Sequence, residues 1–190
     1  MPKATIQTEN AKICAAVLRL VAAKGWKNVT LEAVAKAAKA SSASFKKSFA
    51  TKNDLIPVII EEIDCKVLAT AGNPSNKPHD VLFDLLMARF DHLQANRGAI
   101  LSIADASRRD PALSRTLACT LWASAQRLAA ATKITAPPLP ILAAGLGAVH
   151  GWAFLAWRRD ESRDMAKTMA ALDRALKLAG KAVGLFKPRS

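Results

Sequence analysis

The chain has 190 residues, 51% of them hydrophobic, which is enough to bury a substantial core in one domain or in a small domain joined to a larger one. Its 28 Lys and Arg against 15 Asp and Glu give a net charge of +13, which favours polyanionic partners. Three widely spaced cysteines without a CxxC pair exclude a disulfide framework and a zinc motif, and the polar N-terminus has no apolar signal core. We therefore expect a protein of a reducing compartment, the cytoplasm.

The first 55 residues combine the densest positive charge with a run of short helices. They hold ten Lys and Arg against three Asp and Glu. Apolar residues recur at helical spacing and predict helices over 8–24, 30–38, 42–49 and 51–70. Gly25 should end the first helix and Thr30 should cap the second. Pro57 lies inside the fourth helix and should bend its first turns.

The rest of the chain predicts longer helices, about nine in all, and an all-α fold. They are expected at His79–Asn96, Arg97–Ser107, Pro111–Thr132, Leu139–Arg159 and Asp164–Val183. The predicted division is a head, residues 1–50, and a helical body, residues 51–190. The segment 139–157 is nearly long enough to span a bilayer. Prolines at its start and His150 within it instead favour a buried bundle helix, with no integral membrane association.

The most specific chemistry lies in residues 30–55. The short helix that starts near Ser42 carries Ser44, Lys46 and Lys47 and almost no negative charge. A small basic helix braced by a second helix is the usual device for entering a DNA major groove. The alternative is that these lysines form a solvated basic face. No Gly-rich phosphate loop, metal-ligand cluster or nucleophile–base pattern appears, so we expect no enzyme, cofactor or metal.

The residue order over 11–55 resembles the TetR family of transcriptional regulators. The similarity lies in the segments ICAA (13–16), LVAAKGW (20–26), VTL (29–31), SF (44–45) and KNDL (52–55). It implies a three-helix helix-turn-helix head, joined by a fourth helix to an all-helical body that binds an effector and dimerises. It also implies that the protein is a transcriptional repressor that binds double-stranded DNA as a homodimer. A small, mostly apolar ligand is expected to modulate this binding.

The resemblance assigns DNA contact to the two short helices and their surroundings. The implied DNA-binding residues are Thr30, Ser41, Ser42, Ala43, Ser44, Lys46, Lys47 and Lys52. Thr30 and Lys52 are expected at phosphates. Where the family has Gly in the turn between these helices, this chain has Lys39. If that residue needs a positive φ, the strain is about 1–2 kcal/mol.

In the body, the resemblance implies a dimer formed by the last two helices and an internal effector pocket. Gly147 and Gly151 give the penultimate helix a side that permits close helix approach. Residues expected to line the pocket are Phe83, Met87, Phe90, Ile103, Trp122, His150 and Trp152. Ordinary core packing is the alternative for each of them. The competing function is that of a lipid-binding accessory protein that has the TetR fold but has lost sequence-specific DNA binding. The Lys39 turn and the apolar segment 139–157 are also consistent with this function.

Overall fold

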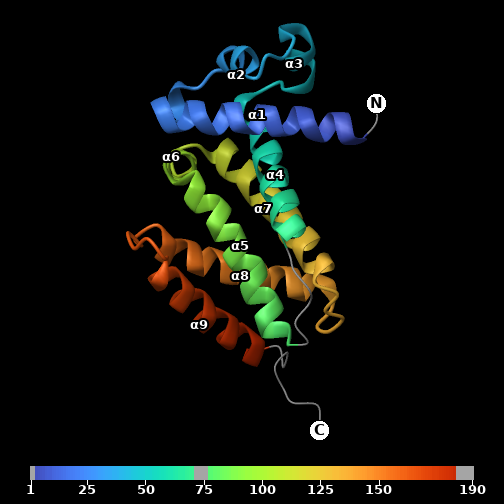
Figure 1. The fold of residues 1–190 in the computed structure, drawn as a ribbon, viewed down its shortest axis with the longest axis vertical. Helices are drawn as coiled ribbons and strands as arrows, with labels where there is room; N and C mark the ends of the chain where they lie inside the picture. The colour runs from blue at the N-terminus through green and yellow to red at the C-terminus, as the bar shows by residue number, and fades with distance from the viewer. Residues whose placement is uncertain (1–2, 71–76, 183–190) are drawn as a thin grey trace. The chain divides into compact units, whose positions relative to one another are not determined.

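The fold is entirely helical in the part of the chain that the structure describes. The computed structural model describes the backbone of residues 3–70 and 77–182, and the side chains of these residues except 3–7, 42–44 and 70. Nine α-helices occupy these ranges: α1 Lys3–Lys24, α2 Leu31–Ala37, α3 Ser42–Ser48, α4 Leu55–Thr70, α5 Pro78–Ala95, α6 Arg97–Ser107, α7 Pro111–Ala131, α8 Leu139–Trp157 and α9 Ala166–Ala182. Two 3₁₀ turns, η1 Trp26–Asn28 and η2 Lys52–Asp54, join them (Figure 1). The predicted all-α class and helix count are confirmed.

The helices form two compact units. The N-terminal unit comprises Met1–Cys65 and His92–Thr120, and the C-terminal unit comprises Lys66–Asp91 and Leu121–Ser190. The N-terminal unit therefore contains α1 to α3, η1 and η2, the larger part of α4, and α6. The C-terminal unit contains α8, α9 and most of α5.

In the N-terminal unit, one apolar stripe of α1 organises the core. Ile13, Val17 and Val21 recur at helical spacing and are buried, and Figure 1 shows α2 and α3 on one side of α1. Gly25 ends the helix with a φ of 77°, a conformation that favours glycine. Trp26 follows it into the core, where it is 2% exposed and its backbone N–H donates to Ser102 Oγ at 2.9 Å.

Helix α4 is preceded by the 3₁₀ turn η2, which carries a capping box. Thr51 and Asp54 form a capping box, in which the Thr51 backbone N–H donates to Asp54 Oδ2 at 2.7 Å. The α-helical hydrogen bonding starts only at Leu55, which places Pro57 in the first α-helical turn. The first turn of an α-helix has backbone N–H groups without intrahelical acceptors, so a proline there removes little.

In the C-terminal unit, α8 and α9 pack side by side (Figure 1). The apolar face of α5, including Leu82, Leu86 and Phe90, is buried, as its spacing predicts. In α8 the fully buried Trp157 completes a stripe that also contains Leu146 and Ala153.

The turn between α8 and α9 is built on one buried carboxylate. Asp160 is 1% exposed, and its Oδ2 accepts hydrogen bonds from the backbone N–H and the hydroxyl of Thr168, both at 2.8 Å. Its Oδ1 accepts from the backbone N–H of Ser162 at 3.1 Å and from the Ser162 hydroxyl. Burial alone would raise the pKa of Asp160, but these hydrogen bonds outweigh it and hold the pKa well below its ordinary value.

Candidate nucleic-acid interface

Helix α2 starts where Thr30 predicts. Thr30 has an extended backbone, with φ −114° and ψ 155°, and its Oγ1 accepts from the Ala33 backbone N–H at 3.2 Å. Val34 and Ala35 are buried and fix the helix to the core of the N-terminal unit. The exposed Thr30 hydroxyl is thus held at the positive N-terminal end of α2.

The turn between α2 and α3 is a Schellman motif with a lysine at its left-handed position. The Ala40 N–H donates to Ala35 O at 3.0 Å, and the Lys39 N–H donates to Lys36 O at 3.2 Å. Lys39 has a φ of 55°. The backbone strain expected from the sequence at this position is therefore present, because a left-handed conformation is unfavourable for an L-residue and not for glycine.

Helix α3 presents its lysines to solvent and its aromatic residues to the core. Phe45 is buried, and its ring centroid lies 4.6 Å from that of the half-buried Phe49. Lys46 and Lys47 are exposed, and Lys46 Nζ lies 3.7 Å from Glu32 Oε1 of α2. A pair this exposed contributes little free energy, so both ammonium groups remain available to an anion.

The backbone places the small residues of α3 at its start. Ser41 precedes the helix with an extended backbone and no side-chain capping bond. Ser42, Ala43 and Ser44 form its first turn, and their side chains lie outside the described residues.

Lys52 makes contacts that the sequence pattern does not reveal. Its Nζ donates to the carbonyl oxygens of Trp26, at 2.8 Å, and of Lys27, at 3.2 Å, and lies 5.2 Å from the centroid of the Trp26 ring. Burial lowers the pKa of the Lys52 amine below its ordinary value, and the Asp110 carboxylate opposes that shift. The ammonium therefore ties η1 to η2, which fixes the start of α4 beside the end of α1.

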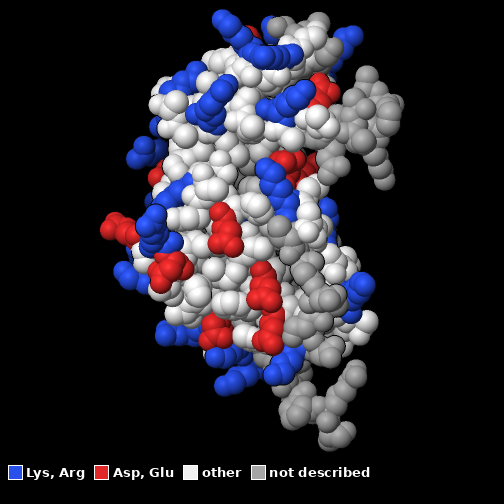
Figure 2. All heavy atoms as spheres, in the orientation of Figure 1, with Lys and Arg blue, Asp and Glu red and all other residues white. Residues whose placement is uncertain are grey.

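Charge in the N-terminal unit is mostly positive on the face drawn in Figure 2. Lys and Arg side chains gather at the top of that view, over the region of α1 to α3, with few acidic groups among them (Figure 2). A surface of this kind attracts the phosphate backbone of nucleic acid whatever its sequence.

Comparisons with known proteins agree with this geometry. The family described as "Bacterial regulatory proteins, tetR family" matches residues 13–59, which span the helix-turn-helix and the start of α4. Residues 13–59 are therefore similar to the N-terminal region of TetR-family regulators. The comparison with curated protein sequences found no match.

Solved structures of TetR-family proteins share the fold over nearly the whole chain. A TetR transcriptional regulator from Nitrosomonas europaea has a TM-score of 0.71 at 19% identity, covering 90% of this chain and 98% of its own. One from Rhodococcus sp. RHA1 has a TM-score of 0.68 at 17% identity, covering 90% and 94%. The Flavonoid-responsive Regulator FrrA has a TM-score of 0.54 at 20% identity, covering 96% and 99%.

The residues predicted for the effector pocket fall into three groups by their burial. Phe90 and Ile103 are buried, Ile103 in the N-terminal unit. Phe83, Met87 and His150 are half-buried in the C-terminal unit. Trp122 and Trp152 are 44% and 59% exposed in the single chain, so their side chains meet solvent there.

The structure brings Phe90 and His150 together. Their rings stack with centroids 5.2 Å apart and 18° between planes, and Phe154 stacks on the same imidazole at 6.3 Å. Buried His150 Nε2 has no hydrogen-bond partner among the described residues. Burial, and to a lesser degree the Arg89 guanidinium, lower the pKa of His150 to about 3. The ring is therefore neutral near pH 7.

The C-terminal unit contains a small cavity, and the stacked rings of Phe90, His150 and Phe154 are not among the residues that line it. It has a volume of about 40 Å³ and apolar walls from α5, α8 and α9 that include Leu82, Leu146 and Leu176. None of the residues predicted for the effector pocket lines it. Its size suits about one water molecule, so an effector there would require the helices to part.

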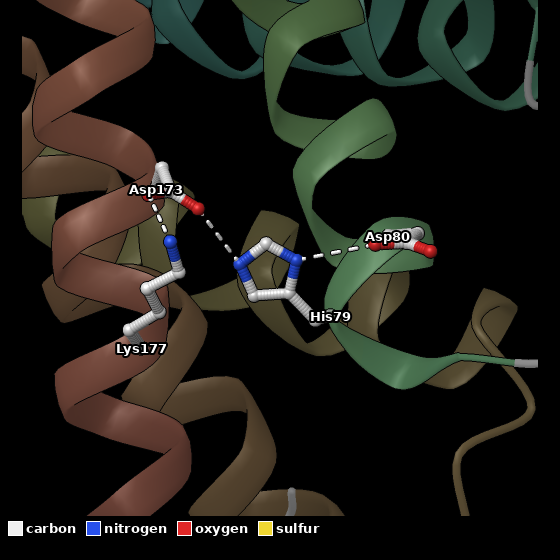
Figure 3. Close-up of polar contacts among 4 residues, drawn as sticks. All are labelled: His79, Asp80, Asp173 and Lys177. Carbon is white, nitrogen blue, oxygen red and sulfur yellow. Dashed lines mark hydrogen bonds and ion pairs between the residues drawn. The ribbon is translucent and has the colours of Figure 1, made fainter.

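A polar cluster links α5 to α9. His79 Nε2 lies 3.1 Å from Asp173 Oδ1, and His79 Nδ1 lies 3.3 Å from Asp80 Oδ1 (Figure 3). Lys177 Nζ donates to Asp173 Oδ2 at 2.7 Å. The Lys177 hydrogen bond, and to a lesser degree His79, lower the pKa of Asp173 below its ordinary value. Since a neutral imidazole has one N–H, only the protonated ring can donate toward both carboxylates.

Helix α8 carries a large apolar face that the single chain leaves open. Ile141, Trp152 and Leu155 are 50–60% exposed, as is Leu178 of α9. Among the described residues α8 is the one helix long and apolar enough to cross a membrane, by length and composition, and 28% of its most apolar window is buried.

Proposed function

We propose that this chain is a cytoplasmic, homodimeric TetR-family repressor that binds operator DNA and is released by a small, mostly apolar effector. The observation that carries the proposal is the exposed basic side of α3, where Lys46 and Lys47 point into solvent from a helix anchored by buried Phe45. A braced helix of this kind is the element that enters the major groove in helix-turn-helix proteins.

The proposed DNA contacts divide by position on the head. Lys46, Lys47 and the small residues Ser42, Ala43 and Ser44 of α3 approach the groove, and Thr30 and Ser41 approach phosphates at the helix starts. Lys52 takes a positioning role, because two of its three N–H donors already bind the carbonyls of Trp26 and Lys27.

The test is a gel shift with the DNA upstream of the protein's own gene, over a salt series. The Lys46→Ala/Lys47→Ala variant should lower affinity and reduce the slope of log K against log [salt] by about 0.9 for each lost phosphate contact. The matched control is Lys24→Ala/Lys27→Ala, which removes the same charge from exposed positions outside α3. Equal losses in both variants, or no sequence-specific shift at all, would contradict operator binding.

The exposed face of α8 and α9 supports dimerisation. Trp152, Leu155 and Leu178 are each about 60% exposed in one chain, and the same face of a second chain would cover them in a four-helix bundle. Leu155→Glu should give a monomer in sedimentation experiments. Leu68→Glu, an equal change at an exposed leucine of α4 that is 36% exposed, should leave the dimer intact.

An apolar effector is supported by the aromatic interior of the C-terminal unit. Phe90 and Phe154 stack on His150, and Trp157 packs against both of these phenylalanines. The buried Nε2 of His150 has no hydrogen-bond partner among the described groups. The fold relative FrrA is described as flavonoid-responsive. A thermal-shift screen of flat aromatic compounds should find ligands that raise the melting temperature. Binding of charged polar ligands alone would contradict the proposal.

A lipid-binding accessory role is the second candidate, and the open apolar face of α8 favours it. Extraction of the purified protein with organic solvent separates the two. A bound isoprenoid lipid together with no DNA shift at any salt concentration would replace the repressor by this function.

A further inference from the structure

The N-terminal unit carries a large open groove whose described lining includes no residue of α3. Its volume is about 960 Å³, and it runs between α1 and the segment 37–40 that ends α2. That volume is at the upper end of the range for small-molecule pockets, and the groove is open along its length rather than enclosed.

The groove has an apolar floor and a basic rim. Ile13 and Ala16 of α1 lie at the base of the floor and are almost fully buried, whereas the half-buried Ala37, Ala38 and Ala40 supply its accessible apolar surface. The exposed side chains of Lys12, Arg19 and Lys39 stand along the rim. Glu9 is the one acidic residue among the described residues that line the groove.

The apolar floor favours an acidic amphipathic helix over a DNA backbone as the anion that this groove binds. A DNA backbone is polar throughout and gains nothing from alanine and isoleucine side chains. An amphipathic helix fits both features, because its apolar stripe can lie on the alanine floor while acidic residues on its flanks meet the lysines and the arginine. Alanines also let two helix backbones approach closely, since they carry only a methyl group.

We propose that this groove binds an acidic amphipathic helix of a partner protein. The bound helix would cover Lys39, two residues before Ser41, which we propose approaches a phosphate. A partner seated there would therefore compete with DNA for the head, which adds a second control to the proposed effector but does not depend on it.

The probe is a fluorescein-labelled helical peptide of about 16 residues, roughly four turns, with alanine and leucine on one stripe and glutamate elsewhere. Fluorescence anisotropy with the full-length protein should show saturable binding that weakens as salt increases. A scrambled peptide of identical composition, which has the charge but no apolar stripe, should bind at least about tenfold more weakly.

Two pairs of variants locate the site. Lys12→Glu/Arg19→Glu should weaken peptide binding by about tenfold or more, whereas Lys24→Glu/Lys27→Glu, with the same change in net charge, should alter it by less than about threefold. Ala15→Trp fills the groove from an exposed position and should block binding. Ala22→Trp, also exposed on α1 but outside the groove, should not.

Three outcomes would overturn the proposal. One is no peptide binding up to about 100 µM. Another is an equal loss in both charge-reversal variants, which would show non-specific attraction. The third is that Lys12→Glu/Arg19→Glu weakens operator binding while the peptide fails to bind, which would assign the groove to the DNA backbone. Failure of the gel shift with wild-type protein, by contrast, would contradict the proposed repressor function. It would not contradict the proposed peptide site, which the anisotropy experiment tests separately.

Discussion

Replacing Lys39 by glycine should stabilise the protein, although glycine usually destabilises helical segments. Lys39 occupies the left-handed position of the α2 Schellman motif with a φ of 55°. That conformation costs an L-residue about 1–2 kcal/mol, which glycine does not pay. Glycine also has more conformational freedom in the unfolded chain, which lowers the free energy of unfolding by about 0.4–1 kcal/mol. The expected net stabilisation is therefore about 0.5–1 kcal/mol.

The matched variant is Lys39→Ala, which removes the same charge but keeps a β-carbon in the strained conformation. Its stability should lie within about 0.5 kcal/mol of the wild type, as for most exposed substitutions. Urea denaturation followed by circular dichroism would compare the three proteins. For a chain of this length, 1 kcal/mol corresponds to about 2–4 °C, so the glycine variant should melt about 1–4 °C higher.

The sign of the difference between the glycine and alanine variants tests the reasoning. In an ordinary helix interior, glycine is less stable than alanine by about 1 kcal/mol. If Lys39→Gly is likewise less stable than Lys39→Ala, then position 39 does not adopt a left-handed conformation, and the Schellman geometry of this turn is wrong.

Three further changes probe the C-terminal unit. Asp160→Asn should cost about 2–4 kcal/mol, because an amide cannot accept all the hydrogen bonds of the buried carboxylate, and only the wild type should lose this contribution as pH falls below about 4. His150→Phe should flatten the acid side of the stability curve. The folded pKa of about 3 lies below the ordinary value of 6.5, so the wild type loses about 1.4 kcal/mol per pH unit below 6.5, or about 2 kcal/mol by pH 5. A double-mutant cycle of His79→Ala and Asp173→Ala should give a coupling of about 0.2–1 kcal/mol that weakens as salt rises, because the two side chains form a partly exposed polar contact at 3.1 Å.

Each of these three has an internal comparison. Asp91→Asn changes an exposed carboxylate of α5 and should leave stability within about 0.5 kcal/mol. If the stability of the His150→Phe protein falls with decreasing pH as steeply as that of the wild type, a group other than His150 causes the pH dependence. A cycle that gives the same coupling at low and high salt would show that His79 and Asp173 interact through packing rather than charge.

The fold of this chain followed from its sequence because its helices carry local signals. Gly25 and Thr30 mark boundaries through their own backbone preferences, and the structure ends α1 and starts α2 at these residues. The capping box at Thr51 likewise depends on residues three positions apart. Signals of this range are visible in sequence, which is why the TetR-like arrangement of helices was predictable.

The contacts that cross the fold were not predictable for the same reason. Lys52 binds carbonyls 25 and 26 residues away, and His79 meets Asp173 from another helix. At the start of α4, Lys52 matched the pattern of a phosphate-binding lysine, and only the position of η1 shows what its ammonium contacts. The presence of a basic group can be inferred from sequence, but its partner depends on how the helices pack.

Helix α8 shows the same limit for apolar residues. Its sequence is apolar on every side, so spacing cannot separate a core face from a pocket, a partner interface or a membrane-facing surface. In the structure, Leu142, Leu146 and Val149 are buried, whereas Trp152 and Leu155 are exposed. The open side also contains Gly147 and Gly151, both exposed. Small residues beside large apolar ones allow a second helix to approach closely, which favours a helix from another copy of the chain over lipid as the cover of this face.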